Sequence, residues 1–465
     1  MATASIETDY LIVGAGAVGM AFADVLLSES DADIVIVDSH HQPGGHWNDA
    51  YPFVRLHQPS SFYGVSSRQL GSGKVDAVGL NQGLYELATG AEVRAYFVDV
   101  MQQQFLPSGR VRFFPMSDYI GDGQFVSRLS GETHTVTAKR HVDATWLKTS
   151  VPSTHTPSFS IADGVRFVTP NQLPDITEPP SQFVIVGGGK TGIDTAIWLL
   201  EQGVDAARIQ WIMPRDAWLL NRKKTQPGIE FFEHSIGAQA DQMAAIAEAT
   251  SIEDLFDRLE AAGVMLRIDR SVRPEMFHGA TVSEAEVDAL RQIEGIVRMG
   301  RVSEISPGKI VLDGGTLEVD PQAVIIDCSA RAIPNTKIKP VFEGDTITPQ
   351  TVRAYQPVFS AAFIAHIELA YRSDAVRNQY CSVVPLPDSL PDWLHMTAIN
   401  SANQFRWSQE PELRRWLRAN RLDGFGKIAS EIPKDDMDKR AVIQRLRENA
   451  APAMANLQRL AAAAG

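Results

Sequence analysis

Cysteine is almost absent from the sequence. Only Cys328 and Cys381 occur, far apart and outside any CxxC or CxxxxC pair. This spacing excludes a local redox-active disulfide and the common zinc motifs, so we expect two buried thiols. Basic residues are also outnumbered, because 43 Lys and Arg stand against 56 Asp and Glu, for a formal net charge of −13. That balance argues against a nucleic-acid partner, which would select a basic face.

Long apolar runs are missing as well. No stretch reaches the roughly 18 residues that a membrane-spanning helix needs. The first strand is expected to start near Asp9, which leaves no room for a signal peptide before it. We therefore expect a cytoplasmic protein with no membrane partner. No Ser/His/Asp or Cys/His arrangement and no metal-ligand spacing stands out. We expect no metal, and demanding chemistry would then belong to an organic cofactor.

What the chain does contain is an internal repeat. DYLIVGAGAVGMAFADVLL (Asp9 to Leu27) matches QFVIVGGGKTGIDTAIWLL (Gln182 to Leu200) in pattern. Each is an apolar strand, a glycine turn and a helix that begins with small residues, which is the arrangement of a dinucleotide-binding unit. The repeat predicts an α/β fold with two Rossmann-like dinucleotide-binding domains.

The first turn is a GxGxxG loop made by Gly14, Gly16 and Gly19. The first glycine allows the tight turn, the second lets backbone N–H groups approach a pyrophosphate, and the third lets the helix pack on the strand. The next strand, DIVIVD, ends at Asp38, where an acid accepts hydrogen bonds from ribose hydroxyls. The loop and Asp38 together predict one dinucleotide site.

The second turn supplies the candidate residues for another dinucleotide, namely Gly187, Gly189, Lys190, Thr191 and Gly192. Its Gly-Lys-Thr ending looks like that of a Walker A loop. That motif needs glycine at position 184, where Val184 stands, so the P-loop interpretation fails.

The strand after the second turn, RIQWIMPR, has no terminal acid. Aligned on DIVIVD, it puts Met213 in the place of Asp38 and Arg215 just beyond. Loss of the carboxylate and gain of a guanidinium favour a 2′-phosphate, and hence NADPH over NADH. Three further basic residues could add to this field, although a solvated surface role is the simpler interpretation for them: Arg222, Lys223 and Lys224.

The chain has one glycine loop followed by a strand-end acid and a second one followed by an arginine instead. Such a chain resembles the two-dinucleotide-binding flavoproteins, which implies FAD at the first loop and NADPH at the second. GGHWNDAYPFVRLHQPSSFY (Gly44 to Tyr63) is similar to the GGxW…YPG…R segment of class B flavin monooxygenases, which include flavin-containing, N-hydroxylating and Baeyer–Villiger enzymes. In that family the segment runs along the flavin. The resemblance therefore implies that five residues lie near the isoalloxazine or the ribityl chain: Gly45, His46, Trp47, Arg55 and His57. The order of elements matches over most of residues 9–370.

Three departures indicate a divergent member of that family. The acid expected after the YPG…R stretch is replaced by Leu56-His57. FVTPNQLPDI (Phe167 to Ile176) stands in place of the FxGxxxHxxx(W/Y) fingerprint, without its glycine or histidine. The two ATG-like crossings read DATW at 143–146 and DCSA at 327–330, neither with the usual glycine. The fold tolerates these changes. They weaken the assignment of the reaction, because the family's motifs are altered.

Gln356-Pro357 precedes an apolar segment, VFSAAFIAHIEL, that reads as a helix. A helix N-terminus at Gln356 is a candidate to stabilise the anionic reduced flavin at its N1–C2=O edge, with plain core packing as the alternative. His366 and His395 are candidates to border a substrate pocket. A hydrogen-bonded core histidine is the simpler interpretation of each.

We divide the chain into four parts: an FAD-binding domain over residues 1–160, an NADPH-binding domain over 161–320 with a helical insertion at 226–300, a return to the FAD-binding domain over 321–400, and a helical C-terminal segment over 401–465. Within the first part we expect an extended loop over 38–68, a helix over 84–104, and strands at 111–115, 125–129 and 133–145.

For function, the resemblance implies an NADPH-dependent FAD monooxygenase. NADPH would pass a hydride to the flavin, O₂ would form a C4a-(hydro)peroxide, and one oxygen atom would go to a small organic substrate. The stretch 226–300 would cover the site, since an exposed peroxide is lost to water. Two alternatives remain open. One is an NAD(P)H-dependent flavin reductase, dehydrogenase or oxidase without oxygen transfer, and the other is a flavoprotein that senses or scaffolds without turnover.

Overall fold

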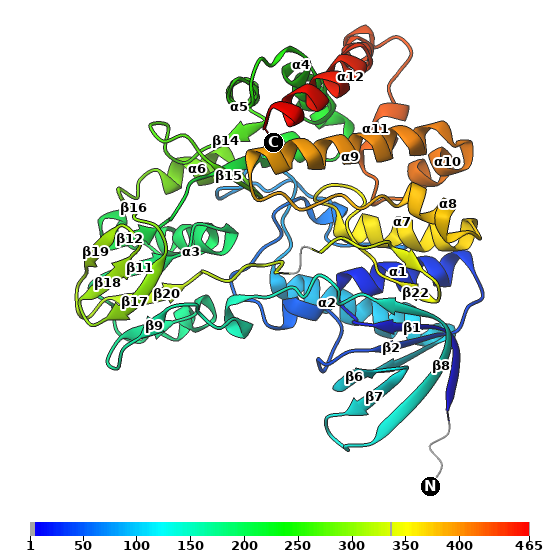
Figure 1. The fold of residues 1–465 in the computed structure, drawn as a ribbon, viewed down its shortest axis with the longest axis horizontal. Helices are drawn as coiled ribbons and strands as arrows, with labels where there is room; N and C mark the ends of the chain where they lie inside the picture. The colour runs from blue at the N-terminus through cyan, green and yellow to red at the C-terminus, as the bar shows by residue number, and fades with distance from the viewer. Residues whose placement is uncertain (1–4, 335–336, 465) are drawn as a thin grey trace.

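We describe the protein from a computed structural model, which covers residues 5–334 and 337–464 (Figure 1). Its first sheet has the strand order β21-β22-β8-β1-β2-β5, and β8 pairs further with β7 and β7 with β6. Its strands, with the helices α1 and α2, are β1 (Ile6–Val13), α1 (Ala17–Glu29), β2 (Ile34–Val37), α2 (Gly90–Val100), β5 (Val111–Phe114), β6 (Ser117–Gly121), β7 (Gln124–Ser127), β8 (Thr133–Asp143), β21 (Phe342–Glu343) and β22 (Thr346–Ile347). A small hairpin, β3 (Gly64–Val65) and β4 (Arg68–Gln69), lies apart from this sheet.

A second, fully parallel sheet has the order β10-β20-β11-β12-β16. Its elements are β10 (Arg166–Val168), β11 (Phe183–Val186), α3 (Lys190–Glu201), β12 (Ile209–Ile212), β16 (Gly295–Val297) and β20 (Val324–Asp327). Two smaller sheets accompany it, with the orders β14-β13-β15 and β19-β18-β17-β9. Their strands are β9 (Ser160–Ile161), β13 (Ala217–Asn221), β14 (Met265–Leu266), β15 (Met276–Val282), β17 (Val302–Ser306), β18 (Lys309–Leu312) and β19 (Gly315–Glu318). The two Rossmann-like units predicted from the repeat are therefore present.

The central strands of both sheets are apolar on both faces. Every residue of β2 and of β11 is buried, as expected for parallel strands covered on two sides. Strand β1 pairs in parallel with β2 on one side and with β8 on the other, and β11 lies in the same way between β12 and β20. Each glycine loop thus leaves the sheet where the strand order reverses, which is where open α/β sheets bind their ligands.

Two boundaries differ from the sequence prediction. The stretch 226–300 is not purely helical, because α4 (Phe232–Glu248), α5 (Ile252–Ala261) and α6 (Glu284–Leu290) alternate with β14, β15 and β16. These strands are short and pair with partners elsewhere in the chain, so their own sequence carries little periodicity. The second unit also extends past residue 320, since β20 pairs with β11, and the chain rejoins the first sheet only at β22, beside β8.

Within the first unit, the helix expected over 84–104 begins later, at Gly90. Thr89 and Glu92 form a reciprocal capping box there, with the Glu92 N–H bonded to the Thr89 hydroxyl and the Glu92 carboxylate bonded to the Thr89 N–H. The strands expected near 111, 125 and 133 are β5, β7 and β8, while β6 was not predicted. The region 38–68 is largely irregular, as expected.

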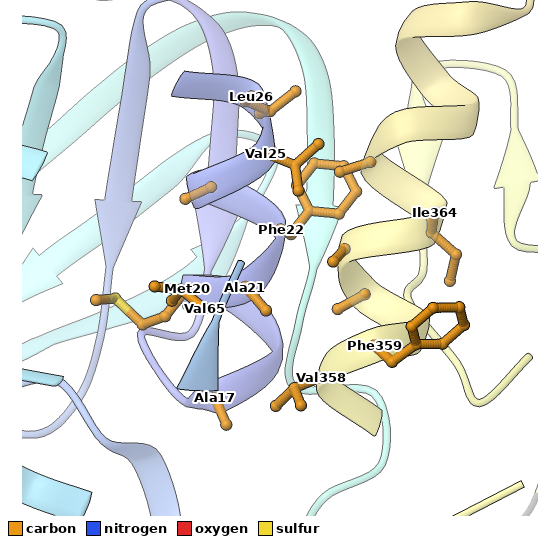
Figure 2. Close-up of a cluster of buried hydrophobic side chains, with 14 of the residues drawn as sticks. Ala17, Met20, Ala21, Phe22, Val25, Leu26, Val65, Val358, Phe359 and Ile364 are labelled. Atoms are coloured by element: carbon orange, nitrogen blue, oxygen red, sulfur yellow. The ribbon is translucent and has the colours of Figure 1, made fainter. Parts of the chain in front are cut away.

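Helix α7 (Pro357–Ala370) confirms the helix predicted after Gln356. It lies beside α1, with Phe22 and Val25 between the two helices (Figure 2). Ala17 and Val358 mark the N-terminal ends of the two helices, which lie at the same end of the pair. Both helix dipoles therefore point their positive ends toward the same region, near the first glycine loop.

The C-terminal segment is helical, as predicted, and it contacts both units. Over 401–465 its helices are the end of α9 (Leu390–Gln409), then α10 (Pro411–Ala419), α11 (Phe425–Ser430) and α12 (Met437–Ala464). Helix α8 (Asp374–Tyr380) and the start of α9 lie before that range. Arg421 donates to the backbone carbonyls of Ser61, Tyr63 and Val65 in the first unit. Helix α12 packs on α4 of the second unit (Figure 1). Among the helices of residues 5–334 and 337–464, none combines the length and the apolar character needed to cross a membrane.

Candidate functional site

The two glycine loops share one geometry. Gly14 (φ +103°) and Gly187 (φ +124°) open the turns in a conformation that favours glycine. A Cβ atom on Gly19 would overlap the carbonyl oxygen of Gly14, and one on Gly192 would overlap that of Gly187. Only glycine lets each helix pack this closely on its strand, as the sequence predicted for the third position of each loop.

The middle glycine of each loop has room beside it. A Cβ atom on Gly189 would meet no other atom within 4 Å, and one on Gly16 would meet only Gly45, at 3.5 Å or more. Helices α1 and α3 start at these glycines with no side chain capping their N–H groups and no acid in the first turn. Such N-termini bind anions readily, so both loops fit the pyrophosphate of a dinucleotide such as FAD or NADPH.

Asp38 directly follows β2, and its carboxylate already has protein partners. It accepts hydrogen bonds from the N–H of Ala15 (2.5 Å) and from both the N–H and Nδ1 of His40 (2.8 Å each). His40 Nε2 lies 2.8 Å from the carboxylate of Asp49. These contacts, chiefly the one to Asp38, raise the pKa of His40 to about 9, so it is a cation at neutral pH. Sequence reasoning missed His40, whose only signal was its position two residues after Asp38.

The segment 44–63 starts directly on the first loop. The Gly44 N–H donates to the carbonyl oxygen of Ala15 (2.9 Å). Gly45 has a positive φ of +56°, and its Cα lies against Gly16. Gly45 therefore lies against the middle glycine of the first loop, and its place beside a bound flavin stays a prediction.

Of three aromatic or imidazole residues in this segment, Trp47 is buried, and His46 and His57 are half-buried. Trp47 donates its Nε1–H to the hydroxyl of Tyr63 (2.8 Å). Burial lowers the pKa of His46 to about 4. Burial also lowers the pKa of His57 well below its ordinary value, with smaller contributions from the charges of Lys190 and Arg222. Both imidazoles are therefore neutral at physiological pH.

Arg55 lies at the edge of this segment. Its side chain is exposed, and its charge acts on Glu201, the last residue of α3, where it opposes the rise in pKa that burial causes. Residue 55 forms a β-bridge with Thr89, and the next residue, Leu56, is buried. The role of Arg55 toward a flavin stays a prediction.

The second loop is tied to the same segment through α3. Lys190 forms an ion pair with Asp194, one helical turn further on. The other carboxylate oxygen of Asp194 accepts a hydrogen bond from the Tyr51 hydroxyl (2.7 Å). The Thr191 hydroxyl also interacts with Tyr51. Lys190 and Thr191, assigned to the coenzyme from sequence, therefore face the first unit as well as the second loop.

Beyond β12, Met213 takes the place of a ribose-binding acid, and its side chain lies against Gly188. Arg215 is exposed just past it. Asp216, which sequence reasoning did not consider, forms a two-pronged ion pair with Arg298 (2.6 and 3.1 Å). The same guanidinium also pairs with Asp269 (3.1 Å), so two carboxylates share one positive charge near Arg215.

The surface interpretation of Arg222 is wrong. Its side chain is 1% exposed, and it donates to the carbonyl oxygen of His57 and the carboxylate of Glu286, both at 2.8 Å. It joins the two units rather than adding to a solvent-facing field, whereas Lys223 and Lys224 are half-buried.

Gln356 is the buried N-cap residue of α7. Its carbonyl oxygen accepts from the N–H of Ser360 (2.9 Å), and its side-chain oxygen lies 3.4 Å from Arg353. The residue before it, Tyr355, has a φ of +61°, a strained conformation for a non-glycine residue. Gln356 thus fixes where α7 begins, and its role toward a flavin stays a prediction.

Neither candidate histidine borders the loops. His366 lies 2.6 Å from Glu29 and stacks on Trp416 at 4.7 Å between ring centroids. It therefore links the far end of α1 to α10, in agreement with the simpler interpretation. His395 is exposed on α9, so the interpretation as a core histidine is wrong, and its place beside a substrate pocket stays a prediction.

The two thiols, Cys328 and Cys381, are buried and free, as expected. Within residues 5–334 and 337–464, no group of three or more His, Cys, Asp or Glu side chains could hold a metal ion.

Comparison with solved structures finds two monooxygenases and a disulfide reductase among the matches. A flavin-containing monooxygenase from Stenotrophomonas maltophilia is 17% identical, with 81% of this chain and 100% of that chain covered and a TM-score of 0.44. Cyclohexanone-bound cyclohexanone monooxygenase is 14% identical, with 79% and 88% covered and a TM-score of 0.47. The bacillithiol disulfide reductase Bdr of Staphylococcus aureus is 10% identical, with 79% and 100% covered and a TM-score of 0.46. Values this low do not transfer an activity.

Sequence comparison gives closer relatives. Residues 12–58 match the family described as NAD(P)-binding Rossmann-like domain. The uncharacterized proteins Rv2000 of Mycobacterium tuberculosis and Mb2023 of Mycobacterium bovis are each 52% identical over 423 residues, which covers 90% of this chain and 78% of each relative. The chain therefore belongs to the same protein family as these two mycobacterial proteins.

Proposed function

We propose that the chain is an NADPH-dependent FAD monooxygenase that transfers one oxygen atom from O₂ to a small organic substrate. The observation that carries this proposal is the pair of glycine loops, each with an uncapped helix N-terminus and room at its middle glycine. Gly14, Gly16, Gly19 and Asp38 would hold FAD, and the loop 187–192 would hold the nicotinamide coenzyme.

The choice of NADPH rests on the end of β12. Arg215 is exposed there, Met213 replaces the acid, and the nearby Asp216 is bound by Arg298. A free carboxylate would repel a 2′-phosphate, whereas a guanidinium can bind it through two charge-assisted hydrogen bonds. This arrangement favours NADPH over NADH.

Oxygen transfer is supported by the segment 44–63, which resembles that of the class B enzymes and lies on the first loop. When bound, FAD would accept a hydride and, once reduced, activate O₂. The chain's part is to bind both dinucleotides and to keep water out. His46 and His57 contribute to this as half-buried, neutral groups. The missing fingerprint at 167–176 favours the second candidate, a flavin reductase or oxidase that does not transfer oxygen.

The cofactor assignment can be tested with two matched glycine variants. Purified protein should release FAD on denaturation, and NADPH should bleach its flavin absorbance without oxygen. Gly189 has an ordinary φ of −82° and free space beside it, so Gly189→Ala should fold and keep FAD. It should weaken NADPH binding by about 10- to 100-fold, the equivalent of about one charge-assisted hydrogen bond lost at the pyrophosphate.

Gly192→Ala is the matched control, because its Cβ would overlap the carbonyl oxygen of Gly187 and should reduce the melting temperature as well as coenzyme binding. A protein that cannot be reconstituted with FAD, or a Gly189→Ala variant that binds NADPH as the original does, would contradict the cofactor assignment.

A further inference from the structure

Helix α3 presents one face to the segment 44–63. Its residues 190, 194 and 198 are spaced by four and therefore lie above one another on that face. Each meets a residue of the segment: the charge of Lys190 acts on His57, Asp194 bonds to Tyr51, and Trp198 stacks on Phe53 at 4.7 Å and 15°. The segment that starts on the first loop is thus docked on the helix of the second.

The charges on this face are in the wrong order for helix stability. Lys190 is the first residue of α3, where the helix dipole disfavours a cation. Lysine four residues before an acid is also the weaker orientation of such a pair. Exchanging Lys190 and Asp194 would suit α3 better, so local stability does not explain the pair. Conflicts of this kind are typical of functional sites.

The carboxylate of Asp194 is shared between the two units. One oxygen binds Lys190 of its own helix, and the other accepts from Tyr51, whose side chain is 5% exposed. Burial and the neighbouring carboxylate raise the pKa of Tyr51 well above its ordinary value. The hydroxyl therefore stays protonated and keeps donating, and breaking this bond would leave a buried polar group unsatisfied.

We propose that Asp194 and Tyr51 are positioning residues that set the placement of the two dinucleotides relative to each other for hydride transfer. The segment they anchor carries Gly44 and Gly45 on the first loop. This inference rests on the proposed function: a hydride leaves C4 of the dihydronicotinamide with both electrons and bonds to flavin N5, so the coenzyme is oxidised and the flavin is reduced. Neither residue touches the reacting atoms.

The test compares Asp194→Asn, Tyr51→Phe and the double variant with the original protein. A misplacement of about 1 Å costs about 100-fold in rate, so each single variant should reduce the limiting rate of anaerobic flavin reduction by NADPH by about 10- to 100-fold. FAD content should change far less, and so should the NADP⁺ dissociation constant of Tyr51→Phe, which keeps the ion pair of Lys190 with Asp194. Because both variants break the contact between Tyr51 and Asp194, the double variant should be no slower than the slower single one.

Tyr10→Phe is the matched control, since Tyr10 lies 3.4 Å from the carboxylate of Glu368 within the first unit. It should leave the reduction rate unchanged. Hydrogen exchange gives a readout without coenzyme: backbone amides of 44–63 should exchange faster in Asp194→Asn and Tyr51→Phe but not in Tyr10→Phe. The inference would be overturned if hydrogen exchange or the reduction rate stayed unchanged in the two single variants. It would also be overturned if the rate fell only in proportion to lost FAD, or if the two effects multiplied in the double variant. An original protein without FAD or NADPH-driven reduction would refute the proposed function instead.

Discussion

At the scale of single residues, His40 holds a positive charge between the carboxylates of Asp38 and Asp49. Its pKa in the folded protein, about 9, lies above the ordinary value of 6.5. Protonation therefore favours the folded state, and the contribution is complete below about pH 6.5 and lost as the pH rises through about 9. Between these values, the free energy of unfolding should fall by about 1–2 kcal/mol more in the original protein than in His40→Gln, allowing for solvent screening.

Denaturant unfolding across this pH range measures the difference. Asp49→Asn should reduce it, because His40 Nε2 then loses its anionic partner while the contact to Asp38 remains. Equal pH profiles for the original protein and His40→Gln would show that the imidazole is not held as a cation.

Residue by residue, the glycine positions were the part of the site most open to prediction. Backbone sterics alone require glycine at Gly19 and Gly192, so the motif implies the geometry. The partners of Asp38 could not be predicted from the motif, because a carboxylate at a strand end can bind either a ribose or a neighbouring imidazole. Tyr51 and Asp194 lie 143 positions apart, and no sequence period joins them.

At the scale of elements, a buried ion pair fixes the C-terminal segment to the stretch just before α7. Arg353 Nη1 lies 2.7 Å from Asp423, and the guanidinium lies 3.7 Å from the ring centroid of Phe359. Removing one partner of such a pair leaves an uncompensated buried charge. Asp423→Asn should therefore reduce the free energy of unfolding by about 3–5 kcal/mol.

The exposed pair of Arg415 and Glu412 provides the control, since Glu412→Gln should change stability by less than about 1 kcal/mol. The double variant Arg353→Met, Asp423→Leu should recover much of the loss by replacing the ions with apolar groups. A loss below about 1 kcal/mol for Asp423→Asn would show that the pair does not fix this segment.

Elements with strong local signals were predicted well and weaker ones were not. β1, α1, β11 and α3 follow from the repeat, and α7 follows from Gln356-Pro357 and the apolar run. In contrast, β14 and β15 are stabilised by pairing with β13, which lies outside their own sequence. The start of α2 is set by the capping box at Thr89. The apolar pattern over 84–104 did not indicate this start.

At the scale of the whole molecule, the repeat predicted two Rossmann-like units, but their connection became visible only in three dimensions. The segment 44–63 joins the two loops, Arg222 links His57 to Glu286, and the C-terminal helices contact both units. These contacts join residues far apart in the sequence, so they could not be predicted from composition or periodicity. They explain how two cofactors bound more than 170 positions apart in sequence could react with each other.

The claim that oxygen is transferred is tested most directly with ¹⁸O₂. The protein with FAD and NADPH is mixed with three probes, a cyclic ketone, an aryl methyl sulfide and a tertiary amine, and both labelled product and hydrogen peroxide are measured against NADPH consumed. A monooxygenase should place one ¹⁸O atom in the product of at least one probe, with peroxide falling by the same amount. Peroxide equal to NADPH with every probe, and no label in any product, would contradict oxygen transfer and favour the oxidase.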